Sequence, residues 1–244
     1  MGIVQKSNGL YILGREDFEH IATVKLKEYS PSNLEQPQPL NTIDFLENYL
    51  GLVVKNRHII GFGILGLTVM SDVAIIPSCD EGFSPILLEE TFGTVLISPY
   101  LLGTENIGRR RYTEMHEASH FILHRSYFER ASSIRKTEAH GYIACREVEV
   151  FNKNRRTDED WLEYQADALA AALLMPRDIF AQYTRKVMHN RGILSNYIAA
   201  PPYVSKSKIR DIISEVADVF RVSYRAAYIR MRHLGLIQEV NISN

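Results

Sequence analysis

One helical segment limits what this chain can fold into more than any other feature. The segment GRRRYTEMHEASHFILHR carries the pattern H-E-x-x-H at residues 116–120. Four residues of an α-helix advance about 400°, so the imidazoles of His116 and His120 lie about 40° apart on adjacent turns and can contact one metal ion. Glu117 points to a different side, where it can reach a metal-bound water rather than the metal. The alternative is an ordinary helix with solvated histidines, because a five-letter pattern also occurs by chance.

A second helical pattern, over residues 158–175, offers a third ligand. In WLEYQADALAAALLMP, Glu163 and Asp167 lie four residues apart on one face. Catalytic zinc commonly takes two histidines and a carboxylate and leaves its fourth position to water, which makes Glu163 the candidate third ligand. Asp167 is the candidate acceptor for the second ring N–H of His116 or His120. The alternative is a pair of surface acids, but the many alanines around them would let this helix approach another one closely.

These residues together have a counterpart in a known family. HEASH, followed by E-x-x-A-D and LLMP, resembles the ImmA/IrrE family of zinc metallopeptidases. The similarity extends to the N-terminal helix pair, to GTVLIS and to VADVFRVSYRAAYIRMRHLGLI, and so covers nearly the whole chain. It implies a gluzincin-like minimal peptidase fold, with His116, His120 and Glu163 as metal ligands and Glu117 as catalytic base. Described members cleave or inactivate repressor-type transcription regulators, so the resemblance implies a protein substrate of that kind.

The leading hypothesis is a Zn²⁺-dependent endopeptidase that hydrolyses a peptide bond in a protein partner, a repressor-type regulator. Zinc lowers the pKa of a bound water from roughly 15.7 to about 7 and polarises the substrate carbonyl. Glu117 would accept the proton of that water as it attacks. A developing oxyanion usually needs a further donor, and the sequence does not choose among four candidates. These are Arg109, Tyr112, His140 and Tyr142.

The C-terminal segment motivates a rival hypothesis. Residues 205–236 are typical of two short helices joined by a tight turn at residues 221–223, similar to a helix-turn-helix. Between residues 205 and 235, seven Lys or Arg stand against three Asp or Glu, a local charge of +4 in a chain of net charge −1. The rival is a DNA- or protein-binding regulator in which the metal site is only structural or vestigial. Of the two roles for this segment, we favour a helix pair docked on the peptidase over a DNA contact.

The order of the patterns predicts an α+β fold, in which a small twisted sheet packs on helices. Helices are expected at residues 15–29, 42–50, 106–125, 158–175 and 176–190, with a break at Pro176. Between residues 52 and 98, short β-rich runs alternate with Gly, Pro, Asp and Ser. GTVLIS, residues 93–98, is either an edge strand that pairs with an extended substrate or a core strand. We divide the chain into a metallopeptidase domain, residues 1–200, and a helix-turn-helix-like segment, residues 201–244.

The remaining features favour a cytoplasmic protein without membrane contact. The longest strongly apolar stretch, residues 59–70, has 12 residues with three glycines and is too short to span a bilayer, and the chain does not begin with a secretory signal pattern. Two cysteines, Cys79 and Cys145, predict no disulfide, and Cys145 is expected to be structural. His124, one turn beyond the motif, is expected to pack or to form a hydrogen bond. GFGILG, residues 61–66, matches G-x-G-x-x-G but precedes a strand pattern, which argues against a dinucleotide site.

Overall fold

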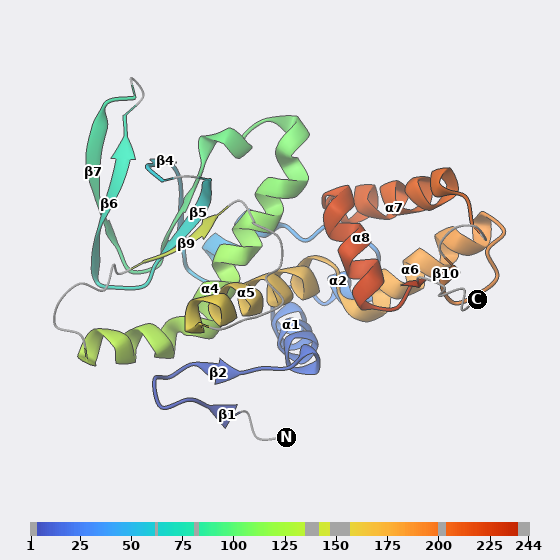
Figure 1. The fold of residues 1–244 in the computed structure, drawn as a ribbon, viewed down its shortest axis with the longest axis horizontal. Helices are drawn as coiled ribbons and strands as arrows, with labels where there is room; N and C mark the ends of the chain where they lie inside the picture. Colours follow the sequence, from blue (N-terminus) through green and yellow to red (C-terminus); the bar gives the residue numbers. More distant parts are fainter. Residues whose placement is uncertain are drawn as a thin grey trace. The chain divides into compact units, whose positions relative to one another are not determined.

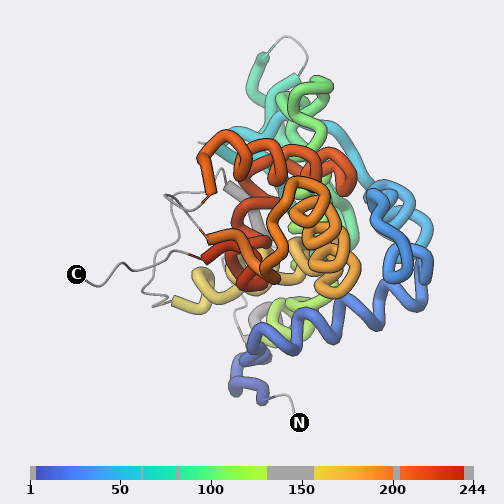
Figure 2. Tube along the Cα trace, turned by 90° about the vertical axis from the view of Figure 1, so that its right-hand side faces the viewer, coloured from blue at the N-terminus to red at the C-terminus, as the bar shows by residue number. Residues whose placement is uncertain are grey.

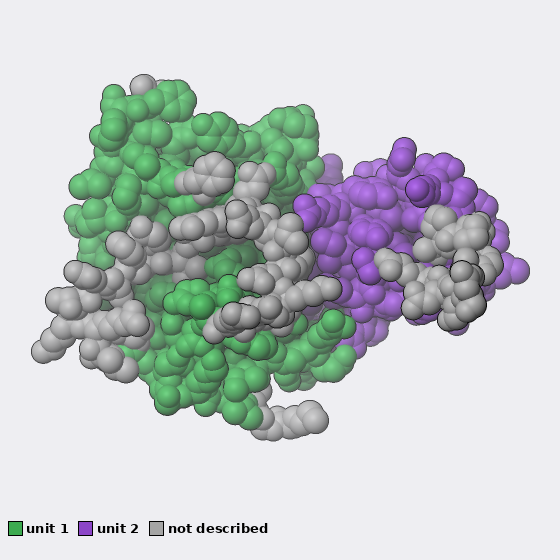
Figure 3. Space-filling model, in the orientation of Figure 1, with its two compact units in different colours: residues 1–20, 41–170 green, residues 21–40, 171–244 purple. Residues whose placement is uncertain are grey.

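The chain folds into α-helices and small sheets. The computed structural model describes residues 4–61, 63–80, 83–134, 142–146, 157–199 and 204–238. The mixture of elements confirms the expected α+β class (Figure 1, Figure 2). The chain divides into two compact units, residues 1–20 with 41–170 and residues 21–40 with 171–244 (Figure 3). None of the helices described is long and apolar enough to cross a membrane.

A four-stranded sheet in the first unit forms one side of the site. Its strands are β3 (Val53–Asn56), β5 (Ile64–Val69), β8 (Thr94–Ile97) and β9 (Tyr142–Arg146), in the order β3-β8-β5-β9. β3 and β8 are parallel, and the other pairs are antiparallel. β8 therefore lies inside the sheet, and all its residues are buried. The edge-strand interpretation of GTVLIS is thus wrong, because β3 occupies the side on which a substrate would have to pair.

A three-stranded antiparallel sheet supports β5. It contains β4 (His58–Ile59), β6 (Val73–Cys79) and β7 (Pro85–Thr91), in the order β4-β6-β7. β6 alternates between exposed and buried residues, so one face of this sheet packs on a core. Ala74 and Ile76 of β6 form a buried cluster with Leu67 and Val69 of β5 and with Leu96 of β8. This cluster fixes the strand that contacts the site.

Two helices of the first unit position the candidate residues. They are α4 (Ile107–Ile134) and α5 (Asp158–Leu174), and α4 packs on β5 (Figure 1). α4 extends beyond its expected end at residue 125, because neither Gly nor Pro interrupts residues 109–134. At the start of α5, the Thr157 hydroxyl accepts from the Asp160 amide (3.1 Å) and the Asp160 carboxylate accepts from the Thr157 amide (3.2 Å). α5 ends just before Pro176, as predicted.

An N-terminal hairpin ties these two helices together. It consists of β1 (Val4–Gln5) and β2 (Tyr11–Ile12), which are antiparallel. The side chains of Lys6 and Asn8 each donate to the Asp158 carboxylate at 2.6 Å. Gly9 has φ +92°, and a Cβ there would lie 2.7 Å from the carbonyl oxygen of Ser126 on α4. The hairpin backbone therefore lies so close to α4 that only glycine fits at this position.

Short helices complete the first unit. The expected helix over residues 42–50 forms as α3 (Thr42–Asp44), followed by the π-turn η1 (Phe45–Tyr49), and Asn41 caps it. Two 3₁₀ turns, η2 (Pro99–Leu101) and η3 (Thr104–Asn106), lead into α4. The Thr42 hydroxyl donates to the buried Glu114 carboxylate at 2.6 Å, and Arg110 pairs with the same carboxylate at 2.7 Å. These contacts anchor α3 to the N-terminal half of α4.

The second unit is mainly helical (Figure 2). It contains most of α1 (Arg15–Tyr29), α2 (Ser32–Glu35), α6 (Arg177–Asn190), α7 (Lys206–Phe220), α8 (Tyr224–His233) and the parallel pair β10 (Ile198–Ala199) and β11 (Ile237–Gln238). The predicted boundary at residue 200 does not coincide with this unit, because Phe180 of α6 packs on Phe220 of α7, with ring centroids 5.1 Å apart.

The helix pair α7 and α8 has the expected tight turn. Arg221 ends α7 in the left-handed conformation, and Ser223 caps α8. Arg230, one of the seven basic residues counted in this segment, is buried, and its guanidinium donates twice to the carbonyl oxygen of Met175 at the end of α5. This residue therefore contributes to packing rather than to a basic surface.

Candidate metal centre

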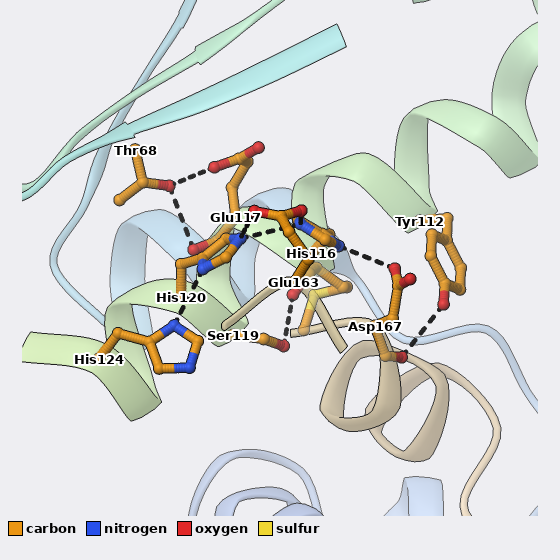
Figure 4. Close-up of polar contacts among 10 residues, drawn as sticks. Thr68, Tyr112, His116, Glu117, Ser119, His120, His124, Glu163 and Asp167 are labelled. Carbon is orange, nitrogen blue, oxygen red and sulfur yellow. Dashed lines mark hydrogen bonds and ion pairs between the residues drawn. The ribbon is translucent and has the colours of Figure 1, made fainter. Parts of the chain in front are cut away.

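Three side chains from two helices converge on one point. α4 carries His116 and His120, whose rings are buried, and α5 brings Glu163 against them (Figure 4). The Nε2 atoms of the two histidines are 2.9 Å apart. Glu163 places Oε2 at 3.2 Å from Nε2 of His116 and Oε1 at 3.4 Å from Nε2 of His120. The structure thus brings together all three residues that the sequence predicts as ligands, within 4.8 Å of one another.

The three side chains are better arranged to bind a metal ion than to form hydrogen bonds with one another. Carboxylate oxygens only accept, and two Nε2 atoms 2.9 Å apart cannot both donate along the same line. A cation among them would bind one ligand atom from each of the three side chains. Ligands at about 2.0–2.1 Å from a tetrahedral zinc ion lie about 3.3 Å from one another, which is close to the spacings seen here. Two imidazoles and a carboxylate are also a donor set that zinc commonly takes.

Asp167 orients the first histidine. Its Oδ1 lies 2.9 Å from Nδ1 of His116. Of the two histidines that the sequence offers as its partner, Asp167 therefore contacts His116. An ionised carboxylate only accepts, and the ring N–H of His116 therefore points at Asp167 and leaves Nε2 for the site. The Tyr112 hydroxyl donates to the carbonyl oxygen of Asp167 at 3.1 Å, which fixes α5 against α4.

The structure places the four candidate oxyanion donors in different surroundings or outside the described residues. Tyr112 lies beside Asp167, one turn before His116 (Figure 4). Arg109 is exposed near the start of α4. Tyr142 belongs to β9, and His140 lies outside the described residues. Of Arg109 and Tyr112, whose side chains the structure describes, Tyr112 is the one that contacts Asp167, the neighbour of His116.

Glu117 is held by β5, which sequence reasoning missed. Its side chain is fully buried, and its Oε2 accepts from the Thr68 hydroxyl at 2.5 Å. The same hydroxyl lies 3.2 Å from the backbone oxygen of Glu117. A Cβ on Gly66 would lie 2.5 Å from Oε1 of Glu117 and 2.7 Å from Cγ2 of Thr113. The available signal was a glycine inside a strand pattern, which often marks a close approach.

The protonation states of His120 and Glu163 are those that metal binding requires. Burial lowers the pKa of His120, although the Glu163 carboxylate opposes this effect. Partial burial alone would raise the pKa of Glu163, but the neighbouring imidazoles of His120 and His116 outweigh it and hold that pKa well below its usual range. Near neutral pH the imidazole of His120 is therefore neutral and Glu163 is ionised. These are the forms in which both groups bind metal ions.

Beyond the metal ligands, His124 forms hydrogen bonds rather than joining the site. Its Nδ1 lies 2.9 Å from Nδ1 of His120, and its Nε2 lies 3.2 Å from Oε1 of Gln165.

Cys79 is a free thiol. Cys145 belongs to β9.

The fold and the site together define a metallopeptidase-type protein. The family model described as Peptidase_M78, IrrE N-terminal-like domain, matches residues 103–232. That match covers more than half of the 244 residues, and the chain belongs to this family. A search of curated proteins gave no match. The matched range runs from the turn before α4 to Arg232 in α8, so α7 and most of α8 belong to the family's domain.

Proposed function

We propose that this chain is a zinc-dependent endopeptidase that hydrolyses a peptide bond in a protein partner, and that the partner is a repressor-type transcription regulator. The observation that carries the proposal is the convergence of His116, His120 and Glu163 at spacings of 2.9–3.4 Å beside the buried carboxylate of Glu117. The family supports a peptidase. The choice of zinc rests on the donor set, and the substrate class rests on the resemblance to the ImmA/IrrE family.

The residues of the chain have separate tasks in the proposed reaction. His116, His120 and Glu163 would hold zinc, which when bound acidifies a water and polarises the substrate carbonyl. Glu117 accepts the proton of the attacking water at its carboxylate and then delivers it to the leaving amine. Thr68 holds Oε2 of Glu117, which keeps the carboxylate in one orientation during both transfers.

The rival hypothesis, a DNA- or protein-binding regulator, has less support than the peptidase. Arg230 is buried and bonded to Met175, so the basic segment offers fewer exposed charges than its sequence indicates. The inclusion of α7 and most of α8 in the family's domain favours a helix pair that belongs to the peptidase domain over a separate DNA-binding module. A repressor-type substrate would place the activity in the cytoplasm.

Cleavage in the presence and absence of metal tests the proposal. Purified protein is incubated with repressor-type regulators encoded near its own gene, and fragments are identified by mass spectrometry. We expect a defined fragment of one regulator with zinc present and none after treatment with a chelator, with recovery when zinc is restored. A fragment that forms at the same rate with the chelator present would contradict a metal-dependent reaction.

A further inference from the structure

His124 is a buried polar side chain that the proposed reaction does not use. It lies on α4 one turn beyond His120 and is 1% exposed. Figure 4 shows its ring next to that of His120. Nδ1 of one ring is 2.9 Å from Nδ1 of the other. Because a buried polar group is costly unless it is hydrogen-bonded, the direction of each hydrogen bond around His124 can be assigned from its partners.

The assignment starts from a backbone carbonyl. The side-chain Nε2 of Gln165, itself 1% exposed, lies 2.7 Å from the carbonyl oxygen of Tyr11 in β2. A carbonyl oxygen only accepts, so the amide group of Gln165 donates there, and its Oε1 must face His124. Nε2 of His124, 3.2 Å from that oxygen, is therefore the donor in the second hydrogen bond.

The proton positions on the two rings follow in turn. A neutral imidazole carries one proton, and the hydrogen bond to Gln165 places that of His124 on Nε2, which leaves a lone pair on Nδ1. That lone pair accepts from Nδ1–H of His120, 2.9 Å away. His120 is left with a lone pair on Nε2, which faces His116 and Glu163.

We propose that Gln165 and His124 are positioning residues of the metal centre, which hold His120 in the Nδ1–H tautomer and aim its Nε2 at the metal. This inference rests on the proposed function, because it assigns a role toward the same metal. The two histidine ligands are then supported differently. His116 donates to the carboxylate of Asp167, whereas His120 donates into an uncharged chain that ends on the Tyr11 carbonyl.

The test compares substitutions that keep or remove the acceptor for His120. His124→Phe keeps a ring but removes the acceptor, and His124→Gln retains an amide oxygen in its place. Gln165→Leu removes the acceptor for His124 instead. Ring ¹⁵N chemical shifts of His120 are recorded in the metal-free protein, and the dissociation constant for Zn²⁺ is measured by competition with a chromophoric chelator. Thermal unfolding of the metal-free variants is measured alongside, so that lost packing is recognised.

We expect wild-type His120 to carry its proton on Nδ1 and His124→Phe to shift it toward Nε2. The zinc dissociation constant should rise about 10–100-fold in His124→Phe, and His124→Gln should recover most of this loss. Gln165→Leu should shift both readouts in the same direction and covers the case in which His124→Phe does not fold.

Two results would overturn the inference. One is a wild-type His120 protonated on Nε2, and the other is an unchanged tautomer and zinc affinity in both His124→Phe and Gln165→Leu, which would leave these residues a packing role. Absence of zinc binding in the wild type would refute the proposed function instead, and the tautomer of His120 in the metal-free protein would still decide the role of His124.

Discussion

Replacing Glu117 by Gln is expected to abolish peptide hydrolysis while zinc stays bound. Gln has nearly the same shape as Glu and its amide oxygen can still accept from Thr68, so the fully buried position tolerates it. It cannot accept a proton from the attacking water. General base catalysis contributes about 10²–10⁴-fold, and we expect a loss in kcat/KM of that order. The measurement is the rate of fragment formation from the cleaved regulator, together with the zinc content of the variant.

A matched control is available on the same helix. Glu114 is also buried in α4, but its carboxylate is bonded to Thr42 and Arg110 rather than facing the metal ligands. Glu114→Gln should lower the unfolding temperature and leave kcat/KM within a few-fold of the wild type at temperatures where it is folded. If Glu117→Gln cleaved at the wild-type rate, the assignment of Glu117 as the base would be wrong.

Substitution of Gly66 by Ala is expected to displace the same carboxylate by a steric clash. The added methyl group would lie 2.5 Å from Oε1 of Glu117 and 2.7 Å from Cγ2 of Thr113, so something must move. The flexible Glu117 side chain yields most readily and loses its 2.5 Å hydrogen bond to Thr68. Because a misplacement of about 1 Å can cost 10²-fold in rate, we expect kcat to fall about 10–100-fold. Zinc affinity should stay within a few-fold, because the three atoms nearest to the new methyl group belong to Glu117 and Thr113 and not to a proposed metal ligand.

A double-substitution cycle shows whether Gly66 acts through Glu117. Thr68→Val removes the hydroxyl and keeps the shape of the side chain, so it should reproduce part of the loss in kcat. If both substitutions act by releasing Glu117, the double variant should be little worse than Gly66→Ala alone. Fully additive losses, or a wild-type kcat in Gly66→Ala, would contradict the proposed restraint. Gly14→Ala, whose Cβ would meet only Asp17 at 3.6 Å, serves as a neutral glycine control.

The core of the candidate site could be predicted from sequence because it depends on helical periodicity. The spacing of His116 and His120 is local to one helix, and the alanine-rich stretch around Glu163 indicated a close helix partner. The contact between Thr68 and Glu117 was not predictable in this way. It joins residues 49 positions apart, and it depends on which face of β5 meets α4, which the register of the sheet decides.

The strand order set a second limit on prediction. The pattern of GTVLIS is equally compatible with an edge strand and a core strand, and only the parallel pairing with β3 makes β8 internal. The tautomer of His120 likewise required Tyr11 and Gln165, which lie 154 residues apart in the chain. By contrast, Pro176 marked the end of α5 directly, because proline disfavours a helical conformation in the residue before it.

The zinc content of the purified protein and of a ligand variant tests the central claim most directly. The wild type should bind one zinc ion per chain, measured by elemental analysis after dialysis. Glu163→Ala should lose it, whereas Glu159→Ala, an exposed acid one turn earlier on α5, should keep it. Equal zinc content in the wild type and in Glu163→Ala would contradict a site built from His116, His120 and Glu163.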